Sequence, residues 1–347
     1  MELRGATLVT ASVIISAVVL VPAANAATSS VVAKDGSGNH TSVQAAINAV
    51  PAGNSSRYTI TIKPGTYKEV VAVPSNKPFI TLVGSTGNAS DVVITYDRAS
   101  GTPKPGGGTY GTSGSASVTL DGNDFTARAL TFSNSFSESA HPEITSQQAV
   151  AVLTRADRLI FDNVRFLGNQ DTLYHNSASV SAVGRAYFRK CYVEGDVDFI
   201  FGRGTGVFDQ CEIKSLSRNS SSNNGYVTAA STNRPNPYGF LFSRCTLTTN
   251  SAAAKTVYLG RPWHPSGDVE AIAQVVFRDS VLGAHVKSSP WTDMSGFSWR
   301  DARFFEYQNT GAGSTITADR PQLTSPQAGA LTPQRYLAGA DNWNPIY

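Results

Sequence analysis

Short apolar runs separated by polar and glycine-rich stretches dominate most of the chain. Between Tyr58 and about Ala284 the runs are brief, and Gly, Asn, Asp and Ser punctuate them. Examples are TITI, FITLV, VVITY, AVAVL, GFLF and QVVF. Such runs predict β-strands, because a strand needs only a few β-branched or aromatic residues between turn signals. No long helical pattern interrupts them.

Helical signals are confined to the two ends of the chain. Four apolar residues between positions 43 and 50 recur at helical spacing, and Thr41 or Ser42 can cap the start. Near the other end, RPQLTSPQAGALTPQRYLAG contains two Ser/Thr-Pro starts and a closing Gly339. We therefore expect one short N-terminal capping helix, and short C-terminal helical turns that cover the last rung.

One local pattern recurs within the strand-rich region. It appears as LIFDNVRF, AYFRKCYV, GVFDQCEI, GFLFSRCTL and VVFRDSVL, with anchors Phe161, Phe188, Phe208, Phe242 and Phe277. The anchors lie 27, 20, 34 and 35 residues apart. A fixed pattern at variable spacing indicates stacked rungs from which loops of different length project. We predict an all-β, right-handed parallel β-helix.

A β-sandwich is the competing architecture. Its hairpins would need two-residue turn signals such as Asn-Gly between neighbouring strands. The sole Asn-Gly, Asn224-Gly225, lies in a Ser/Asn-rich loop. The sequence therefore favours the β-helix.

The three cysteines occupy one slot of the repeat. Cys191, Cys211 and Cys245 each follow a phenylalanine anchor by three residues. Stacked rungs would hold such positions about 4.8 Å apart, which is within the Cα range of a disulfide. We expect a Cys191–Cys211 disulfide with Cys245 as a buried free thiol; three buried free thiols are the alternative.

The first 26 residues have the composition of a secretory signal peptide. Arg4 precedes the apolar run ATLVTASVIISAVVLV, and Ala24-Asn25-Ala26 forms a small-residue cleavage site. We expect export of residues 27–347 as one secreted, extracellular domain. No other apolar run reaches the roughly 18 residues that a membrane span needs. A net charge of +3 is too small for a charge-driven nucleic-acid binder.

Several common sites are excluded by their missing motifs. The chain has no GxSxG, HExxH, CxxC or GxxxxGK[ST], and its five histidines are scattered. No pair of histidines therefore has the spacing of metal ligands. Gly106, Gly108 and Gly111 match GxGxxG only formally, because no βαβ unit surrounds them.

A set of polar residues lies within otherwise apolar strand segments. Asp198 is flanked by Val197 and by FIF, and a carboxylate in such surroundings is costly unless it is paired or functional. The full set is Gln148, Gln170, Asp171, Asp198, Arg261 and Trp263. Gln148 and Asp171 are 23 residues apart, and Asp171 and Asp198 are 27 apart. Each interval approximates one rung, so the side chains should lie together on one parallel sheet.

Two carboxylates in such an arrangement should differ in protonation. At about 4.8 Å and an effective dielectric near 20 they repel by roughly 3.5 kcal/mol, which favours a proton on one of them. A neighbouring Arg261 would lower the pKa of the carboxylate that it contacts. A retaining glycosidase also uses closely spaced carboxyl groups. Gln148 and Gln170, however, favour an ester substrate, because amide donors stabilise the oxyanion of acyl transfer.

Five segments in order resemble the signature segments of the pectin methylesterases. They are GTYKE (65–69), QAVAV (148–152), GNQDTL (168–173), GDVDFIFG (195–202) and LGRPW (259–263), and the resemblance extends over nearly the whole chain after residue 26. The resemblance implies a parallel β-helix esterase without a cofactor. It also implies that methyl-esterified homogalacturonan (pectin) is the substrate, which loses its C6 methyl esters.

The same resemblance implies a role for each site residue. Asp198 would be the nucleophile and Asp171 the acid and base, while Gln170 and Gln148 would stabilise the oxyanion. Arg261 would orient Asp198. Trp263 and Phe201 would pack against sugar rings, and Thr112 and Met294 would line the cleft. Glu69 in GTYKE is expected to be structural.

The chain departs from the plant-type pattern in one interval. The segment HNSASVSAVGR (175–185) is several residues longer, which indicates a longer external loop on one rung. The alternatives are a polygalacturonase or lyase, or a non-catalytic polysaccharide-binding β-helix. The first two would need an added aspartate cluster or a calcium-binding acidic cluster, and neither is present. A monomer is the expected state.

Overall fold

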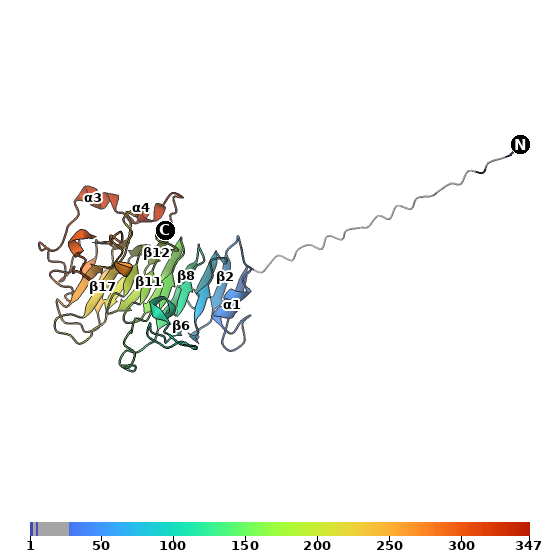
Figure 1. The fold of residues 1–347 in the computed structure, drawn as a ribbon, viewed down its shortest axis with the longest axis horizontal. Helices are drawn as coiled ribbons and strands as arrows, with labels where there is room; N and C mark the ends of the chain where they lie inside the picture. Colours follow the sequence, from blue (N-terminus) through green and yellow to red (C-terminus); the bar gives the residue numbers. More distant parts are fainter. Residues whose placement is uncertain (3–4, 6–27) are drawn as a thin grey trace.

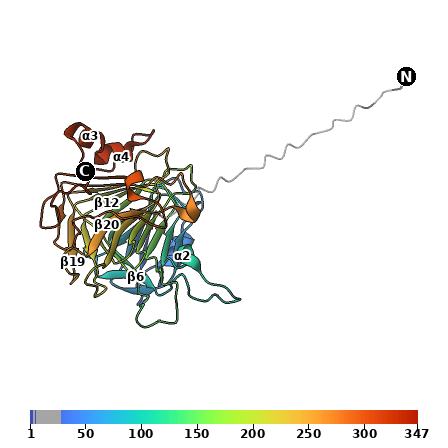
Figure 2. The same cartoon turned by 60° about the vertical axis from the view of Figure 1, so that its left-hand side comes forward.

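Parallel strands stacked in successive rungs make up most of the chain. The computed structural model describes residues 1, 2, 5 and 28–347. Its strands form a right-handed parallel β-helix, with the rungs in sequence order along the long axis (Figures 1 and 2). All of the strand pairings are parallel within this part of the chain. The predicted fold class is therefore confirmed. The signal peptide is expected over residues 1–26. Apart from residues 1, 2 and 5, these lie outside the described residues.

A seven-stranded sheet forms one face of the described β-helix. Its strands are β4 (Val71–Val73), β7 (Val118–Leu120), β9 (Val152–Thr154), β11 (Leu173–His175), β14 (Ile200–Gly202), β17 (Gly225–Ala230) and β20 (Val257–Pro262). They lie side by side in this order. Phe201 and Arg261 lie in this sheet, and the other predicted site residues lie in turns, loops and one short helix beside it.

A sixteen-stranded sheet forms the remaining wall of the described chain. Its main path is β1 (Ser29–Val32), β2 (Tyr58–Ile62), β5 (Ile80–Gly84), β8 (Thr126–Asn134), β10 (Leu159–Leu167), β12 (Arg185–Arg189), β15 (Thr205–Asp209), β18 (Phe240–Ser243), β21 (Gln274–Arg278) and β23 (Arg303–Tyr307). The other strands are β3 (Gly65–Lys68), β6 (Val92–Tyr96), β13 (Tyr192–Gly195), β16 (Glu212–Ser215), β19 (Thr246–Thr249) and β22 (Val281–Leu282). The long strands β8 and β10 each pair with strands of the main path and with strands of the other group. The sheet therefore bends at β8 and β10 into two faces.

The phenylalanine anchors form a continuous ladder inside the β-helix. Phe161, Phe188, Phe208, Phe242 and Phe277 are register partners from strand to strand. Neighbouring rings stack nearly parallel, with centroids 4.3–4.8 Å apart. Aromatic stacking at the rung spacing adds to the burial of these rings, so the repeat that predicts the rungs also fixes their register.

The predicted disulfide is absent. Cys191, Cys211 and Cys245 are all free and buried. Each thiol donates to the carbonyl of a phenylalanine on the preceding rung, at 3.3–3.4 Å. In an in-register parallel stack the Cα–Cβ bonds of equivalent residues point the same way, whereas a disulfide needs them to converge. The Cys191–Cys211 prediction is therefore wrong, and the alternative of three free thiols is correct.

The N-terminal capping helix forms as predicted. Helix α1 (Val43–Ala49) begins after Ser42, whose hydroxyl accepts the Ala45 N–H. The carboxylate of Glu69 accepts the N–H groups of Val43 and Gln44 at 2.8 and 2.9 Å. An anion at a helix N-terminus pairs the free amides and complements the helix dipole. Glu69 is thus a structural cap, as expected.

The C-terminal helices form where predicted, and only the first of them packs against the last rung. Helix α3 (Ser325–Ala330) and helix α4 (Pro333–Ala338) each begin at a Thr N-cap followed by an early proline, and Gly339 ends α4. They lie against the outside of the sixteen-stranded sheet (Figure 1). There, Tyr336 and Leu337 pack with outward residues of β12, β15 and β18. Helix α4 thus covers the flank of the central rungs, because those strands carry apolar residues on both faces. Helix α3 covers the flank of the last strands, where Ser325 bonds Tyr307 of β23 and Ala328 accepts from Arg278 of β21.

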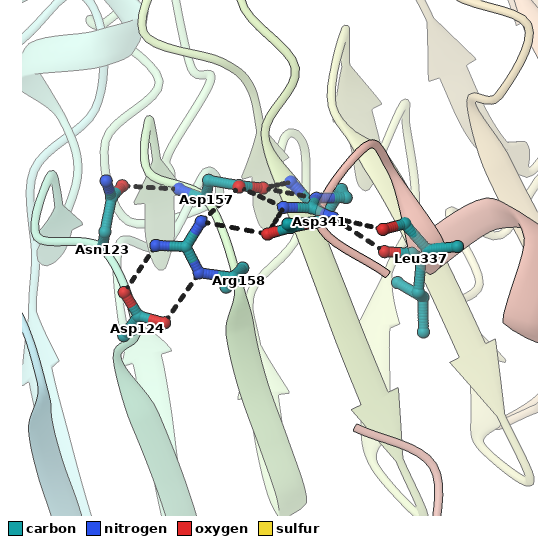
Figure 3. Close-up of polar contacts among 8 residues, drawn as sticks. Asn123, Asp124, Asp157, Arg158, Leu337 and Asp341 are labelled. Atoms are coloured by element: carbon teal, nitrogen blue, oxygen red, sulfur yellow. Dashed lines mark hydrogen bonds and ion pairs between the residues drawn. The ribbon is translucent and has the colours of Figure 1, made fainter. Parts of the chain in front are cut away.

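Ion pairs fasten the segment after α4 to the β-helix (Figure 3). Arg185 bonds Asp341, Asp157 and the carbonyl of Leu337, and its side chain is only 7% exposed. Arg158 bonds Asp124 through two nitrogens at 2.8 Å. We call the Arg185–Asp157–Asp341 group the C-terminal clamp.

The remaining elements are short. They are α2 (Gly111–Gly114) and the 3₁₀ turns η1 (Pro265–Gly267) and η2 (Trp299–Asp301). The segment 176–184 joins β11 to β12 on the surface, as expected for an external loop, and Val180 and Val183 are exposed there. No helix in the described part of the chain has the length and apolarity to span a membrane.

Candidate active site

A cavity of about 540 Å³ opens on the outer face of the seven-stranded sheet. All nine residues predicted to form the site line it: Thr112, Gln148, Gln170, Asp171, Asp198, Phe201, Arg261, Trp263 and Met294. They come from six segments of the chain that are distant from one another in sequence. The stacking of rungs is what brings them together.

The strand register places the two aspartates at equivalent points of neighbouring rungs. Leu173 of β11 pairs with Ile200 of β14, so Asp171 and Asp198 each precede a paired residue by two positions. The Asp171 N–H donates to the Val197 carbonyl at 3.0 Å, which joins the two turns directly. Both aspartates have positive φ, 68° and 50°, a region that Asp tolerates better than most residues. Their exposures are only 7% and 6%.

Side-chain alternation along the sheet creates an outward row beside the aspartates. Leu153, Tyr174, Phe201, Ala229 and Arg261 are register partners from β9 to β20. The preceding residue of each strand faces the core instead, because successive strand residues point to opposite faces. Ala229 contributes only a methyl group to the row. The Arg261 side chain can therefore extend back across it toward Asp198.

Arg261 holds Asp198 in a bidentate ion pair. Its Nε and Nη2 donate to the two carboxylate oxygens at 2.8 and 2.6 Å. The guanidinium lies 3.8 Å from the ring centroid of Tyr226, which itself stacks on Tyr258. A planar guanidinium on an aromatic face, with two parallel hydrogen bonds to one carboxylate, has little freedom to turn. This fixes the orientation of Asp198.

The two aspartates differ in their electrostatic surroundings. Burial first, and then the charge of Asp198, raise the pKa of Asp171 well above its ordinary value; Arg261 and the Gln170 amide act in the opposite direction. Burial also raises the pKa of Asp198, but its direct hydrogen bonds and ion pair with Arg261 oppose that rise. The pair therefore favours a proton on Asp171 and a charge on Asp198.

Two side-chain amides border the carboxylates. Gln170 immediately precedes Asp171, and the Ala149 N–H donates to its carbonyl at 3.1 Å, which brings Gln148 alongside. Within the described chain the Oε1 of Gln148 is buried and has no hydrogen-bond partner. The side-chain oxygen of Gln148 is thus not engaged by a protein donor, and Gln148 lines the cavity.

Aromatic rings line the same cavity. Tyr174 and Phe201 stack at 4.2 Å between centroids, and Trp263 lies 5.9 and 5.6 Å from them. Trp263 follows Arg261 by two residues, so it shares the outward face. Flat apolar surfaces of this kind accept the faces of sugar rings. Thr112 of α2 and Met294 complete the lining.

Sequence reasoning missed several residues of the site. Tyr110, Ser113, Tyr174 and Ala229 line the cavity, and Tyr226 lies beneath Arg261. Strand alternation in TLYH signals Tyr174, because its neighbour Leu173 faces the core. Tyr226 has no such signal, since its position under Arg261 depends on the pairing of β17 with β20. The described residues contain no cluster of three or more His, Cys, Asp or Glu that could hold a metal ion.

Comparison with known proteins identifies the family of the chain. The family model described as Pectinesterase matches residues 29–338. The chain belongs to the pectinesterase family. It is accordingly a carboxylic ester hydrolase.

Individual pectinesterases match over most of their length. A pectinesterase of Ralstonia solanacearum is 41% identical over 314 residues, which cover 82% of this chain and 79% of the relative. Pectinesterase 31 of Arabidopsis thaliana is 38% identical, covering 86% and 88%. The structure of a pectin methylesterase from Erwinia chrysanthemi superposes with a TM-score of 0.82 at 34% identity, covering 91% of this chain and 98% of that one. The β-helix is thus the fold of solved pectinesterases.

Proposed function

We propose that this protein is a secreted pectin methylesterase that converts the C6 methyl esters of homogalacturonan to carboxylates and methanol. Family membership supports the ester hydrolysis. Solved pectin methylesterases with TM-scores of 0.81 and 0.82 were crystallised with hexasaccharides, which supports a polysaccharide ligand. The aromatic lining of the cavity suits such a ligand, and the signal-like residues 1–26 support secretion.

The observation that carries the mechanism is the unequal pairing of the two aspartates. Asp198 is held by Arg261 in a bidentate ion pair, whereas Asp171 has no ion pair within the described chain. An ionised Asp198 is suited to attack the ester carbonyl carbon and form an acyl-enzyme anhydride. A protonated Asp171 is suited to give its proton to the departing methoxide, which leaves as methanol.

The second half of the reaction regenerates both groups. Asp171, now ionised, accepts a proton from a water molecule as that water attacks the anhydride carbonyl. The C–O bond to Asp198 breaks, which frees the product carboxylic acid and restores the Asp198 carboxylate. The proton taken by Asp171 re-forms the acid needed for the next cycle. No external oxidant, reductant or cofactor enters this balance.

The amides of Gln170 and Gln148 are assigned to the oxyanion. Negative charge develops on the carbonyl oxygen when Asp198 attacks, and side-chain N–H donors in a buried site stabilise it. The two glutamines border the aspartates on adjacent rungs, and both line the cavity. Phe201 and Trp263 would support the sugar rings.

A methanol assay tests the proposed function. Methyl-esterified pectin should release methanol without new reducing ends, which excludes a polygalacturonase, and without unsaturated products, which excludes a lyase. Asp198→Asn should lower kcat about a thousandfold or more, because it removes the nucleophile while keeping its shape. Substantial turnover by folded Asp198→Asn would contradict the assignment. Mass analysis of the exported protein should find Ala27 as its first residue.

A further inference from the structure

A third buried carboxylate lies next to the catalytic pair. Asp196 precedes Asp198 by two residues and is only 6% exposed. Its Oδ1 accepts the Val197 N–H at 2.6 Å, and its Oδ2 accepts from Arg218 at 3.0 Å. The side chain faces a second cavity, lined also by Glu138, Asn169 and Arg218, on the other side of the catalytic turns. The mechanism described above gives Asp196 no role.

The backbone of Asp196 joins three consecutive rungs. Its N–H donates to the Asn169 carbonyl at 3.2 Å, and its carbonyl accepts the Tyr226 N–H at 2.9 Å. A Cβ on Gly225 would lie 1.9 Å from that carbonyl oxygen, so only glycine permits the approach. Asp196 thereby connects the turn of Asp171 with the strand whose Tyr226 supports Arg261.

The side chain of Asp196 continues this connection to the reacting groups. It holds the N–H of Val197, and the carbonyl of Val197 accepts the N–H of Asp171. Asp198 then follows in a left-handed backbone conformation, which costs free energy unless neighbouring contacts hold it. Fixing the two peptide groups on either side of Val197 supplies such contacts.

We propose that Asp196 is a positioning residue for the reaction: its carboxylate fixes the turn between the two catalytic aspartates and places a third negative charge beside them. This inference rests on the proposed function. Nothing in the mechanism requires a third acid, so the role concerns where the pair sits and over which pH range it works.

The charges around the pair decide the sign of the effect. Asp171 faces Asp198, Asp196 and Arg261, and the charge of Asp196 raises the pKa of both catalytic aspartates. Asp196 itself faces Arg218 and Glu138, and its charge also raises the pKa of Glu138. A negative charge favours the protonated form of a neighbouring acid, so Asp196 extends the pH range in which Asp171 holds its proton.

Asp196→Asn tests the charge while keeping an oxygen for the Val197 N–H. The pKa of Asp171 should fall, so the alkaline limb of kcat/KM for methanol release should move to lower pH by about half a unit or more. The acid limb, set by Asp198, should move in the same direction. Asp196→Ala removes the hydrogen bond as well, and it should lower kcat further than Asp196→Asn.

Arg218→Gln supplies the opposite perturbation. It removes the cation that offsets Asp196, so the alkaline limb should move to higher pH. Asp162→Asn is the matched control: Asp162 pairs with Arg189 at 2.9 Å on β10, in the other sheet, and its loss should leave both limbs in place. If Asp196→Asn fails to fold, the direction of the Arg218→Gln shift decides the question.

The outcomes separate this inference from the proposed function. Opposite shifts in the Asp196 and Arg218 variants, with none in Asp162→Asn, support the positioning role. Unmoved limbs in folded Asp196→Asn, or an equal shift in the control, overturn it while methanol release by the wild type still stands. A wild type that releases no methanol overturns the proposed function, and the inference falls with it.

Discussion

At the residue scale, the Arg261–Asp198 pair sets the acid side of the pH range in the proposed mechanism. Arg261→Lys cannot reproduce two parallel hydrogen bonds, because an ammonium is a point charge without the guanidinium fork. The pKa of Asp198 should therefore rise, and the acid limb of kcat/KM should move to higher pH. Protonation of the nucleophile also predicts a lower kcat at acidic pH. An acid limb that stays in place in pH–rate profiles of the folded variant would contradict this account.

At the element scale, the outward row of the seven-stranded sheet determines whether Arg261 reaches its partner. Ala229 is the small member of that row, between Phe201 and Arg261. Ala229→Leu would place a branched side chain in the path of the guanidinium, so we expect kcat for methanol release to fall at least tenfold. Circular dichroism should show a retained β-helix, because the added atoms point outward. Wild-type kcat in this variant would show that the path is not needed.

Also at the element scale, the stack of cysteines makes a prediction about thiols. With no disulfide, a thiol reagent should titrate three cysteines in denaturant and none in the native protein, since all three are buried. Burial also raises the pKa of the Cys211 and Cys245 thiols, which disfavours the reactive thiolate. A single titratable thiol in non-reducing denaturant would show that two of the cysteines form a disulfide.

The repeat and the aspartate spacing show which parts of the fold and the site can be predicted from the sequence. The phenylalanine repeat predicts the rungs because each anchor is buried at the same point of its coil, and the interval from Asp171 to Asp198 predicts their meeting because it spans one rung. The direction in which a side chain points is harder to predict from the sequence. The cysteine spacing alone cannot show that equivalent thiols point in parallel.

Long-range packing limits the prediction further. The place of Tyr226 beneath Arg261 depends on register, and the path of α3 and α4 depends on apolar residues that face outward from β12, β15 and β18. Alternation would assign those outward positions to solvent. Only the folded coil shows that they form a docking face.

At the scale of the whole molecule, the C-terminal clamp fastens the flank of the central rungs. Arg185→Gln would remove the buried guanidinium and leave Asp157 without its main ion-pair partner. The free energy of unfolding should therefore fall by about 2–4 kcal/mol. Arg335→Gln is the matched control, because Arg335 lies exposed on α4 and should change stability by less than about 0.5 kcal/mol. Denaturant midpoints measure both. Equal midpoints for the two variants would show that the clamp adds no stability.

The clamp also joins the middle of the chain to its end. Arg185 contacts Leu337 and Asp341 across separations of 152 and 156 residues, whereas strand pairing joins each rung to its immediate neighbours. Every residue of the proposed site lies at or before Met294, whereas two partners of Arg185 lie beyond it, at Leu337 and Asp341. Removal of the residues after 332 would therefore leave the proposed site complete in sequence while the middle of the coil loses its fastening.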